Sequence, residues 1–491
     1  MKLLNPATNS NPVGEEGVVT VQTVAPTFAR HGVAFAGMYL FTLLLYLRPN
    51  ELFPEVFGNL QIIKFVAVTG LVAYVIGKMS NAEPMTIWTI EVKMVMVMVV
   101  LSLVLMVGAI SPDESWFQFS DTYSKVVIIF LMMTNLLDTR ERLIKVFNLV
   151  IAGGIWVAYY AIQTYNAGEY MLIAKGITRI AGVGGGMFGN PNDLANALDM
   201  LIPMAFVLGL SRKGIVRYVY FGCVALFCYA VQITYSRGAF LGLIAMAVFM
   251  AWKLGRGRRF KMIVFSTVAV GLILAASPGG FGKRMATIFD VEKDQTGSSY
   301  QRRELLKRAL VVVAAHPIGV GMANYHYYSL NEERAHNAFL EASAELGLLG
   351  LLAYLIINFA PLIKLWRFER KMGEPKSERE KEIYNICVGL QATFIAYYVC
   401  SFFASIQYYW FLYYPVAHTI AFLRINQLSQ AVSSEETALV PSGMQQPAGG
   451  QTKGGVLWQP NYAQIGILWA KRNQPRQKET VAKGRLWEKA G

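Results

Sequence analysis

Long apolar runs recur along most of this 491-residue chain, and they restrict the possible folds more than any other feature of the sequence. A helix that crosses a bilayer core about 30 Å thick needs about 20 apolar residues. Hydrophobic residues make up 54% of the chain and charged residues only 15%, whereas soluble domains carry about 25% charged residues. The sequence therefore predicts an all-α polytopic membrane protein.

Twelve runs reach or approach the length of a membrane span. They lie at 33–47, 60–79, 91–110, 122–137, 143–163, 194–211, 214–233, 236–253, 260–277, 338–363, 383–403 and 406–424. The first and fourth are the shortest. Residues 1–32 are polar and lack the early apolar core of a cleaved signal peptide, so we expect the first run to be a retained anchor.

The loops between these runs indicate an orientation. Alternate loops are basic, as in "DTRERLIK" and "GRGRRFK", while the opposite set includes the acidic "ISPDESWFQFSD". By the positive-inside rule the basic set is cytoplasmic, and twelve crossings place both termini there. This topology and a basic tail explain the net charge of +14, so we expect no nucleic-acid partner.

Two outer loops depart from the rule because they are basic. The loop at 164–193 holds Lys175 and Arg179, and the long loop at 278–337 holds many Lys and Arg residues. Long loops are only weakly governed by the positive-inside rule. Alternatively, a basic outer surface attracts an anionic ligand, and loop composition leaves both explanations open.

Composition also suggests how the chain is divided. The segment after residue 430 is rich in Ser, Gln, Pro and Gly and then basic, which predicts a disordered cytoplasmic tail that contacts membrane lipids. The predicted parts are a cytoplasmic N-terminal segment (1–32), transmembrane helices (33–179), a core (180–355) that includes the loop 278–337, further transmembrane helices (356–429) and the tail (430–491).

The stretch "RIAGVGGGMFGNPNDLANALDMLIP" begins at Arg179. Asn190, Asn192 and Asp193 have turn and cap chemistry, and we expect Asn192 or Asp193 to start the next helix. The glycines form either a simple helix connector or a backbone surface for a ligand headgroup. With no strand expected before them, they do not make a dinucleotide fingerprint.

In "ITYSRGAFLGL", Arg237 opens an apolar segment at the outer face. A charge at this depth is costly unless it is paired or meets water. Arg237 therefore either snorkels to the interface or points into an outward-facing cavity, where its planar fork suits phosphate.

The stretch "SSYQRRELLKRALVVVAAHPIGVGMANYH" predicts an amphipathic helix that a serine caps and that ends before His316. Arg303 and Lys307 share one face. Leu306 and Leu310 share another. We expect this helix to lie at the outer membrane surface, where it either contacts lipid headgroups or covers a site as a cationic lid.

In "RAHNAFLEASAELGLLGLLAYL", Arg334, His336 and Asn337 stand directly before a long apolar helix. His336 is neighboured by Asn337 and lies about one turn from Glu341, so it can be oriented and made more basic, as a general base requires. Glu341 and Glu345 then support His336 or tie helices together. The alternative is a purely structural cluster. No His or Cys pair has zinc-ligand spacing, so we expect no metal site.

These motifs resemble the bacterial O-antigen ligase and O-antigen polymerase superfamily. The resemblance rests on "GNPNDLA", "SRGAFLGL", "SSYQRRELL" followed by "HPIGVG", and "HNAFLEASAELGLLGLL", in this order. It covers roughly 180–355, and the flanking helices only by topology. It implies a GT-C-like glycosyltransferase of the inner membrane, without a cofactor. Such an enzyme moves a glycan from undecaprenyl diphosphate to an acceptor hydroxyl on the periplasmic face.

The resemblance also implies residue roles. Arg237 and Arg303 would stabilise the diphosphate, and His336 would take the acceptor proton. Lys307 stands where relatives often have an aromatic residue, so the second arginine is either Arg303 or Arg302. Further substrate-binding candidates are Arg179, Arg302, Asn190, Asn192, Arg334, Asn337 and Glu341.

Two alternatives stay open. The acceptor hydroxyl belongs to a lipid A core, to a protein or to another glycan repeat unit, and this choice separates a ligase from a polymerase. A secondary transporter or lipid-carrier flippase also suits twelve crossings. A transporter should show charges at the bilayer midplane and two matching halves with broken helices, whereas the charged candidates here cluster at the outer face.

Overall fold

The computed structural model describes residues 31–49, 55, 62–173, 177–180, 188–255, 260, 264, 271, 281–286, 288 and 298–439. Residues His31–Gln430 form one compact unit. The predicted N-terminal segment, the tail beyond residue 439, the glycines at 184–186 and nearly all of the predicted span 260–277 lie outside the described ranges.

The compact unit is a bundle of long apolar helices. They are α1 (Gly32–Leu47), α4 (Ile62–Ser80), α5 (Ile90–Met106), α7 (Ser124–Leu136), α8 (Arg140–Asn166), α9 (Pro191–Leu210), α10 (Gly214–Ile233), α11 (Arg237–Leu254), α15 (Ala338–Met372), α16 (Glu378–Ser401) and α17 (Trp410–Leu439). Each coincides with a predicted run.

Seven helices of the described chain are long and apolar enough to cross a membrane, namely α4, α8, α9, α10, α11, α15 and α16. The shorter α1 is also apolar. The chain is thus a helical, polytopic membrane protein, as predicted, and the number of twelve crossings stays a prediction.

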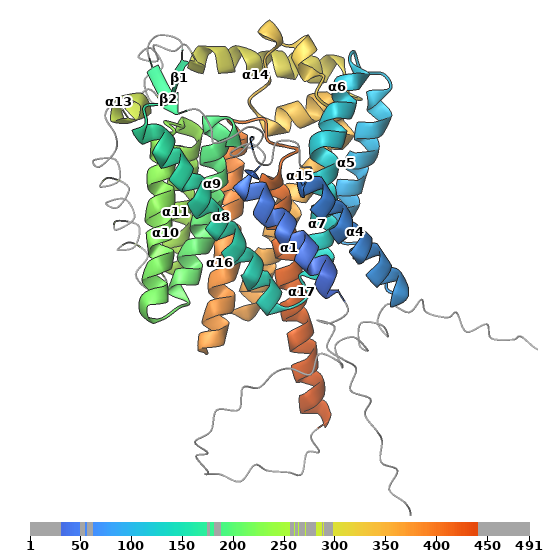
Figure 1. The fold of residues 1–491 in the computed structure, drawn as a ribbon, viewed down its shortest axis with the longest axis vertical. Helices are drawn as coiled ribbons and strands as arrows, with labels where there is room; N and C mark the ends of the chain where they lie inside the picture. Colours follow the sequence, from blue (N-terminus) through green and yellow to red (C-terminus); the bar gives the residue numbers. More distant parts are fainter. Residues whose placement is uncertain are drawn as a thin grey trace, which may run out of the picture. The chain divides into compact units, whose positions relative to one another are not determined.

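Helices that pack together often lie far apart in the sequence. α9 packs against α10 and α16, α11 against α16, and α5 against α15. Helix α14 (Ser298–Ala315) lies across one end of the bundle, close to α6 (Pro112–Phe117), at the top of Figure 1. We call this end of the bundle the α14 end.

A small hairpin also lies at the α14 end (Figure 1). Strands β1 (Tyr170–Ile173) and β2 (Ile177–Ile180) pair antiparallel, with Met171 opposite Arg179. The expectation that no strand precedes the glycines is therefore wrong, whereas the fold is otherwise helical, as predicted. "YMLI" and "ITRI" are rich in β-branched and aromatic residues, but four-residue runs show too little periodicity to be assigned from sequence.

Helix α14 is amphipathic, although not with the predicted apolar face. Leu305, Ala309 and Val312 are buried against the chain that follows, whereas Leu310 is 58% exposed. The sequence offers two apolar stripes one residue apart, and packing against residues 320–344 selects the stripe that starts at Leu305. The exposed stripe with Leu310 suits a helix at a membrane surface.

Helix α15 is interrupted two turns after its start. Gly347 has φ +69°, and a Cβ there would lie 2.1 Å from the Ile318 carbonyl oxygen. The carbonyls of Ala344 and Glu345 accept hydrogen bonds from Val320 N and Gly321 N, both at 2.9 Å. The "HPIGVG" loop thus supplies the backbone partners that the interrupted helix lacks, so the two motifs form one structure.

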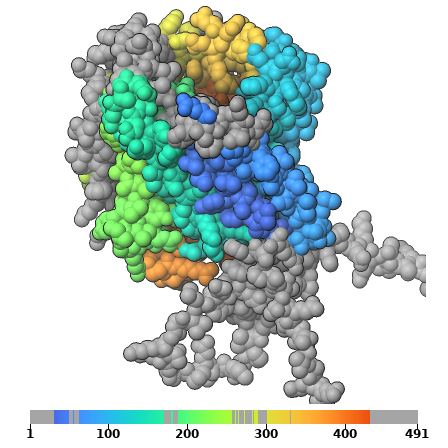
Figure 2. Space-filling view, viewed as in Figure 1, coloured from blue at the N-terminus to red at the C-terminus, as the bar shows by residue number. Residues whose placement is uncertain are grey.

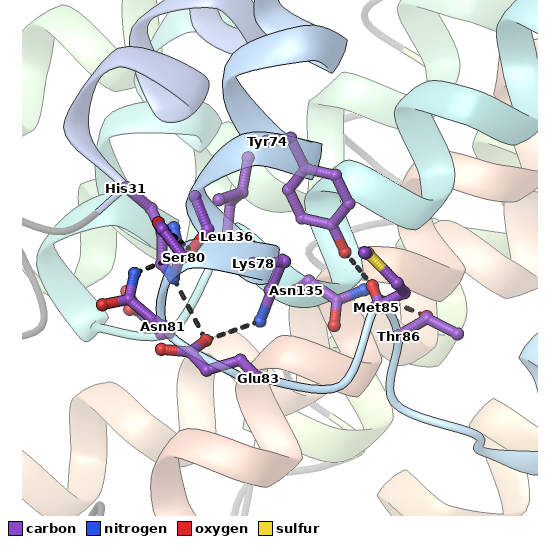
Figure 3. A network of polar contacts seen from close by, with 12 residues as sticks. His31, Tyr74, Lys78, Ser80, Asn81, Glu83, Met85, Thr86, Asn135 and Leu136 are labelled. Carbon is purple, nitrogen blue, oxygen red and sulfur yellow. Dashed lines mark hydrogen bonds and ion pairs between the residues drawn. The ribbon is translucent and has the colours of Figure 1, made fainter.

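The opposite end of the bundle is held by paired charges. In Figure 3, Glu83 accepts hydrogen bonds from Lys78 at 2.9 Å and from His31 at 3.1 Å, which joins the ends of α1 and α4. Close by, Asn135 of α7 donates to the hydroxyl of Thr86 at 3.1 Å. His31 therefore has a structural contact in this part of the bundle.

Candidate functional site

Three helices begin at the α14 end with a capping side chain. Asn190 caps α9 and accepts from Asn192 N, Ser236 caps α11, and Asn337 caps α15 by accepting from Phe339 N and Leu340 N. Helix α9 starts at Pro191, one residue before Asn192 and two before Asp193, the two predicted starts. Pro191 takes the first helical position because its fixed φ suits that turn.

Arg179 of β2 joins the hairpin to two of the long helices. Its Nε donates to the Thr234 carbonyl at the end of α10 at 2.8 Å, and a terminal nitrogen donates to Asn192 Oδ1 of α9 at 2.8 Å. The side chain is buried, with 6% of its surface exposed. The guanidinium is therefore fixed between α9 and α10.

Three other arginines act electrostatically on Arg179. Burial, followed in order by the charges of Arg284, Arg302 and Arg237, lowers the pKa of Arg179 to about 9. We call Arg179, Arg237, Arg284 and Arg302 the arginine cluster. Like charges held together in a partly buried place favour a bound anion.

Arg237 and Arg284 are both tied to the same turn. Arg237 is the first residue of α11 and is buried. Arg284 lies on the short helix α13 (Phe281–Ala286), and its Nε donates to the Tyr235 carbonyl at 2.9 Å. Tyr235 itself has φ +53°, a costly conformation for a residue other than glycine that persists only where the surroundings hold it.

His336 occupies the matching position before α15. Its φ is +50°, it directly precedes the cap Asn337, and its backbone N–H donates to Ser405 Oγ at 3.1 Å. Tyr235 likewise directly precedes the cap Ser236. The starts of α11 and α15 thus share one arrangement. In each, a residue with left-handed backbone angles directly precedes the cap residue.

The His336 imidazole is held in its neutral form. Burial is the largest cause that lowers its pKa, and the charge of Arg302 lowers it further, against opposing contributions from Glu341 and Glu333. Glu341 raises the pKa of His336, as predicted, but its contribution is smaller than the opposing ones. Desolvation and a nearby guanidinium outweigh the carboxylate. A neutral imidazole is nevertheless the form that accepts a proton near pH 7.

Glu341 holds the segment that carries His336. Its carboxylate accepts from Arg334 Nε at 3.1 Å, from Ala335 N at 3.0 Å and from Gln407 Nε2 at 3.1 Å, and also from the Ser405 hydroxyl. The charge of Glu341 raises the pKa of Arg334. Glu341 therefore acts on His336 through the backbone and the 405–407 connector.

The structure separates the two neighbouring arginines of α14. Arg303 is exposed, whereas Arg302 is partly buried and acts on both Arg179 and His336. Lys307, on the face of Arg303, pairs with Glu304 at 2.7 Å and is exposed. The geometry brings Arg302 into the candidate site and leaves Arg303 at the surface.

Sequence reasoning missed three residues of this region. Arg284 was one of several basic residues in the long loop, and no motif singled it out. Ser405 and Gln407 lie in the connector "ASIQYY" between α16 and α17. The only signal in this connector was two polar residues close to aromatic ones, and this pattern does not indicate what Ser405 and Gln407 contact.

The comparison with family models supports this reading. An O-antigen ligase family model matches residues 221–355, a range that contains Arg237, Arg284, Arg302 and His336. No curated protein matches the sequence. The match shows that residues 221–355 of this helical membrane protein are similar to the O-antigen ligase family.

Proposed function

We propose that this chain is a membrane glycosyltransferase of the O-antigen ligase type. It would move a glycan from undecaprenyl diphosphate to an acceptor hydroxyl. The observation that carries this proposal is the arginine cluster beside the neutral His336. These residues lie near the starts of α9, α11 and α15.

The arginine cluster would receive the diphosphate. As the bond between the anomeric carbon and the diphosphate oxygen breaks, the leaving group takes the electron pair and gains negative charge. Guanidinium groups fixed in advance stabilise that charge without reorganising, which is often the largest contribution to catalysis. Arg237 and Arg302 would take the two diphosphate-stabilising roles that the resemblance implies for Arg237 and for one of the α14 arginines.

His336 would act as the general base. The acceptor oxygen forms the new bond to the anomeric carbon from the face opposite the diphosphate, so the configuration inverts, and the hydroxyl proton passes to the imidazole. General-base help of this kind contributes about 10²–10⁴-fold. The partly buried, neutral imidazole is in the required protonation state.

The other candidate residues take positioning roles. Asn192 holds Arg179, Asn190 and Asn337 cap the helices that bear on the site, and Glu341 with Arg334 fixes the His336 segment. We place the α14 end in the periplasm, because the basic loops of the positive-inside pattern lie at the opposite end. The carrier's lipid tail would then lie among the helices of the inner membrane.

Reconstitution in proteoliposomes tests the proposal. With an undecaprenyl-diphosphate-linked glycan as donor, the His336→Ala variant should lose at least about 10²-fold in transfer rate. His316→Ala, at the end of α14, is the matched control and should stay within about twofold. Transfer by His336→Ala at the rate of the unaltered protein would refute the base assignment, and carrier movement across the bilayer without transfer would indicate a flippase.

The nature of the acceptor separates ligase from polymerase, and we favour the ligase. In a strain that lacks the chain, a ligase predicts full-length glycans that accumulate on the carrier. A polymerase predicts the loss of all glycans longer than one repeat unit.

A further inference from the structure

A cavity of about 300 Å³ lies at the α14 end beside the candidate site. This volume is at the lower limit of pockets that hold small ligands. Figure 2 shows the surface hollowed between the yellow residues of α14 and the cyan residues of α5 and α6. The cavity is lined by Glu114, Phe117, Gln118, Ala323, Tyr325, His326, Glu332, Arg334, Glu341 and Glu345.

The charge of this lining is opposite to that of the arginine cluster. Four carboxylates line the cavity and only one arginine does, Arg334. That arginine is already paired with Glu341 at 3.1 Å. No member of the arginine cluster lines the cavity, so two neighbouring regions of the α14 end carry opposite signs.

Two buried polar atoms in the lining have no hydrogen-bond partner in the described chain. They are Glu345 Oε2, an acceptor, and Gln118 Nε2, a donor. Glu345 is 1% exposed. The Tyr408 hydroxyl and the Ala323 backbone both act on Glu345, but neither makes a hydrogen bond of regular geometry to Oε2. Buried polar atoms whose partners are poorly placed or missing are costly, so Glu345 Oε2 and Gln118 Nε2 favour a ligand that brings hydroxyl groups.

The cavity and His336 share a residue. Glu341 lines the cavity and also bonds Ser405, whose hydroxyl oxygen accepts the hydrogen bond from the backbone N–H of His336. Arg334 lines the cavity two residues before His336. A molecule seated in the cavity therefore lies against the segment that presents the proposed base.

We infer that this acidic cavity binds the acceptor, and that it selects an uncharged sugar unit over one that carries phosphate or carboxylate. The inference rests on the proposed function and adds the class of acceptor. Sugar hydroxyls both donate and accept, which matches the partnerless Glu345 Oε2 and Gln118 Nε2. The rings of Phe117 and Tyr325 offer apolar surface for a sugar face.

The same arrangement keeps the two substrates apart. An anionic acceptor unit would meet like charges in the cavity and be drawn to the arginine cluster, where it would compete with the diphosphate. Within the described ranges no group of His, Cys, Asp and Glu side chains is placed to hold a metal ion. A hydroxyl-rich neutral sugar is the ligand that the lining favours.

Equilibrium binding to the purified full chain in nanodiscs tests the inference separately from catalysis. The probes are a neutral hexose tetrasaccharide and the same tetrasaccharide with one phosphomonoester. We expect the neutral probe to bind at least about tenfold more tightly. Glu332→Gln removes one charge from the exposed side of the lining and should narrow the preference for the neutral probe by about two- to threefold.

Glu114→Gln supplies a second variant, because Glu114 is half-exposed and its replacement leaves the helix core intact. It should narrow the preference by about two- to threefold. Glu378→Gln, an exposed residue at the start of α16, is the control and should leave the preference unchanged.

Equal binding of the two probes, or a preference that neither cavity variant changes, would overturn the inference. Transfer from the lipid-linked donor, measured on the same preparations, keeps the two proposals distinct. Selective binding without any transfer would refute the proposed function and leave the cavity assignment standing. Transfer without selective binding would refute the cavity assignment alone.

Discussion

The two ends of the helix bundle both hold buried charge, but they use it differently. At the end opposite α14, buried carboxylates have close cationic partners. Glu369 is bound by Lys253 at 2.7 Å and by Gln391 at 3.0 Å, and Glu91 is bound by Lys364 at 2.6 Å. At the α14 end, the strongest charges acting on Arg179 are three other arginines.

The paired charges have a structural role, whereas we assign a functional role to the arginine cluster. Paired charges at one end satisfy each other and fasten α11, α15 and α16 or α5 and α15 together. Arginines held near one another repel, even where each also has a contact of its own, and a bound anion relieves that repulsion. Folding explains the first arrangement, and we expect the second to bind an anion.

The largest difference in activity is expected between two single substitutions at neighbouring arginines of α14. Arg302→Ala should lower kcat/KM for glycan transfer by about 10²–10³-fold, because it removes one preorganised donor to the leaving group. The neighbouring Arg303→Ala should stay within about twofold, because Arg303 is exposed. Steady-state kinetics in proteoliposomes give the answer, and the reverse order of effects would return the role to Arg303.

A conservative substitution at the start of α11 tests whether the arginine cluster needs the shape of the guanidinium group or only its charge. Arg237→Lys keeps the charge and removes the planar fork, so we expect about a tenfold loss in kcat/KM. Lys253→Arg at the other end of the same helix is the control and should have little effect on transfer. An unchanged rate for Arg237→Lys would show that only its charge matters.

The pH profile reports how the cluster acts on the base. The pKa of His336 is lowered below its ordinary value of about 6.5 by burial and Arg302. A base must be unprotonated, so kcat/KM should fall only as the pH drops below that value. Arg302→Gln should move this acid limb to higher pH, whereas Glu333→Gln should move it to lower pH. Shifts in the same direction would contradict this account.

The smallest effect on activity is expected where the charges are paired. Glu369→Gln leaves Lys253 without its partner and should cost about 3 kcal/mol of stability, read as a lower Tm in detergent. Transfer by the folded protein should stay within about twofold. A large loss of kcat at unchanged Tm would show that this end of the bundle takes part in the reaction.

Most of the helical framework could be predicted from the sequence, because a 20-residue apolar run has few alternatives. Arg237 and His336 could be singled out for the same reason, since polar residues at the mouth of such runs are conspicuous. The hairpin at 170–180 could not, because short strands lack a distinctive period. Arg284, Ser405 and Gln407 could not either, because only the folded chain brings them beside partners far away in sequence.

The interruption at Gly347 has a consequence for how the protein is made. Backbone groups left without partners in lipid cost several kcal/mol each, and the carbonyls of Ala344 and Glu345 find theirs on Val320 and Gly321. The 317–321 loop leaves the ribosome before α15 does. We expect the start of α15 to insert stably into the bilayer only after that loop has bound to it. Membrane insertion of α15 and formation of the His336 segment would then occur together.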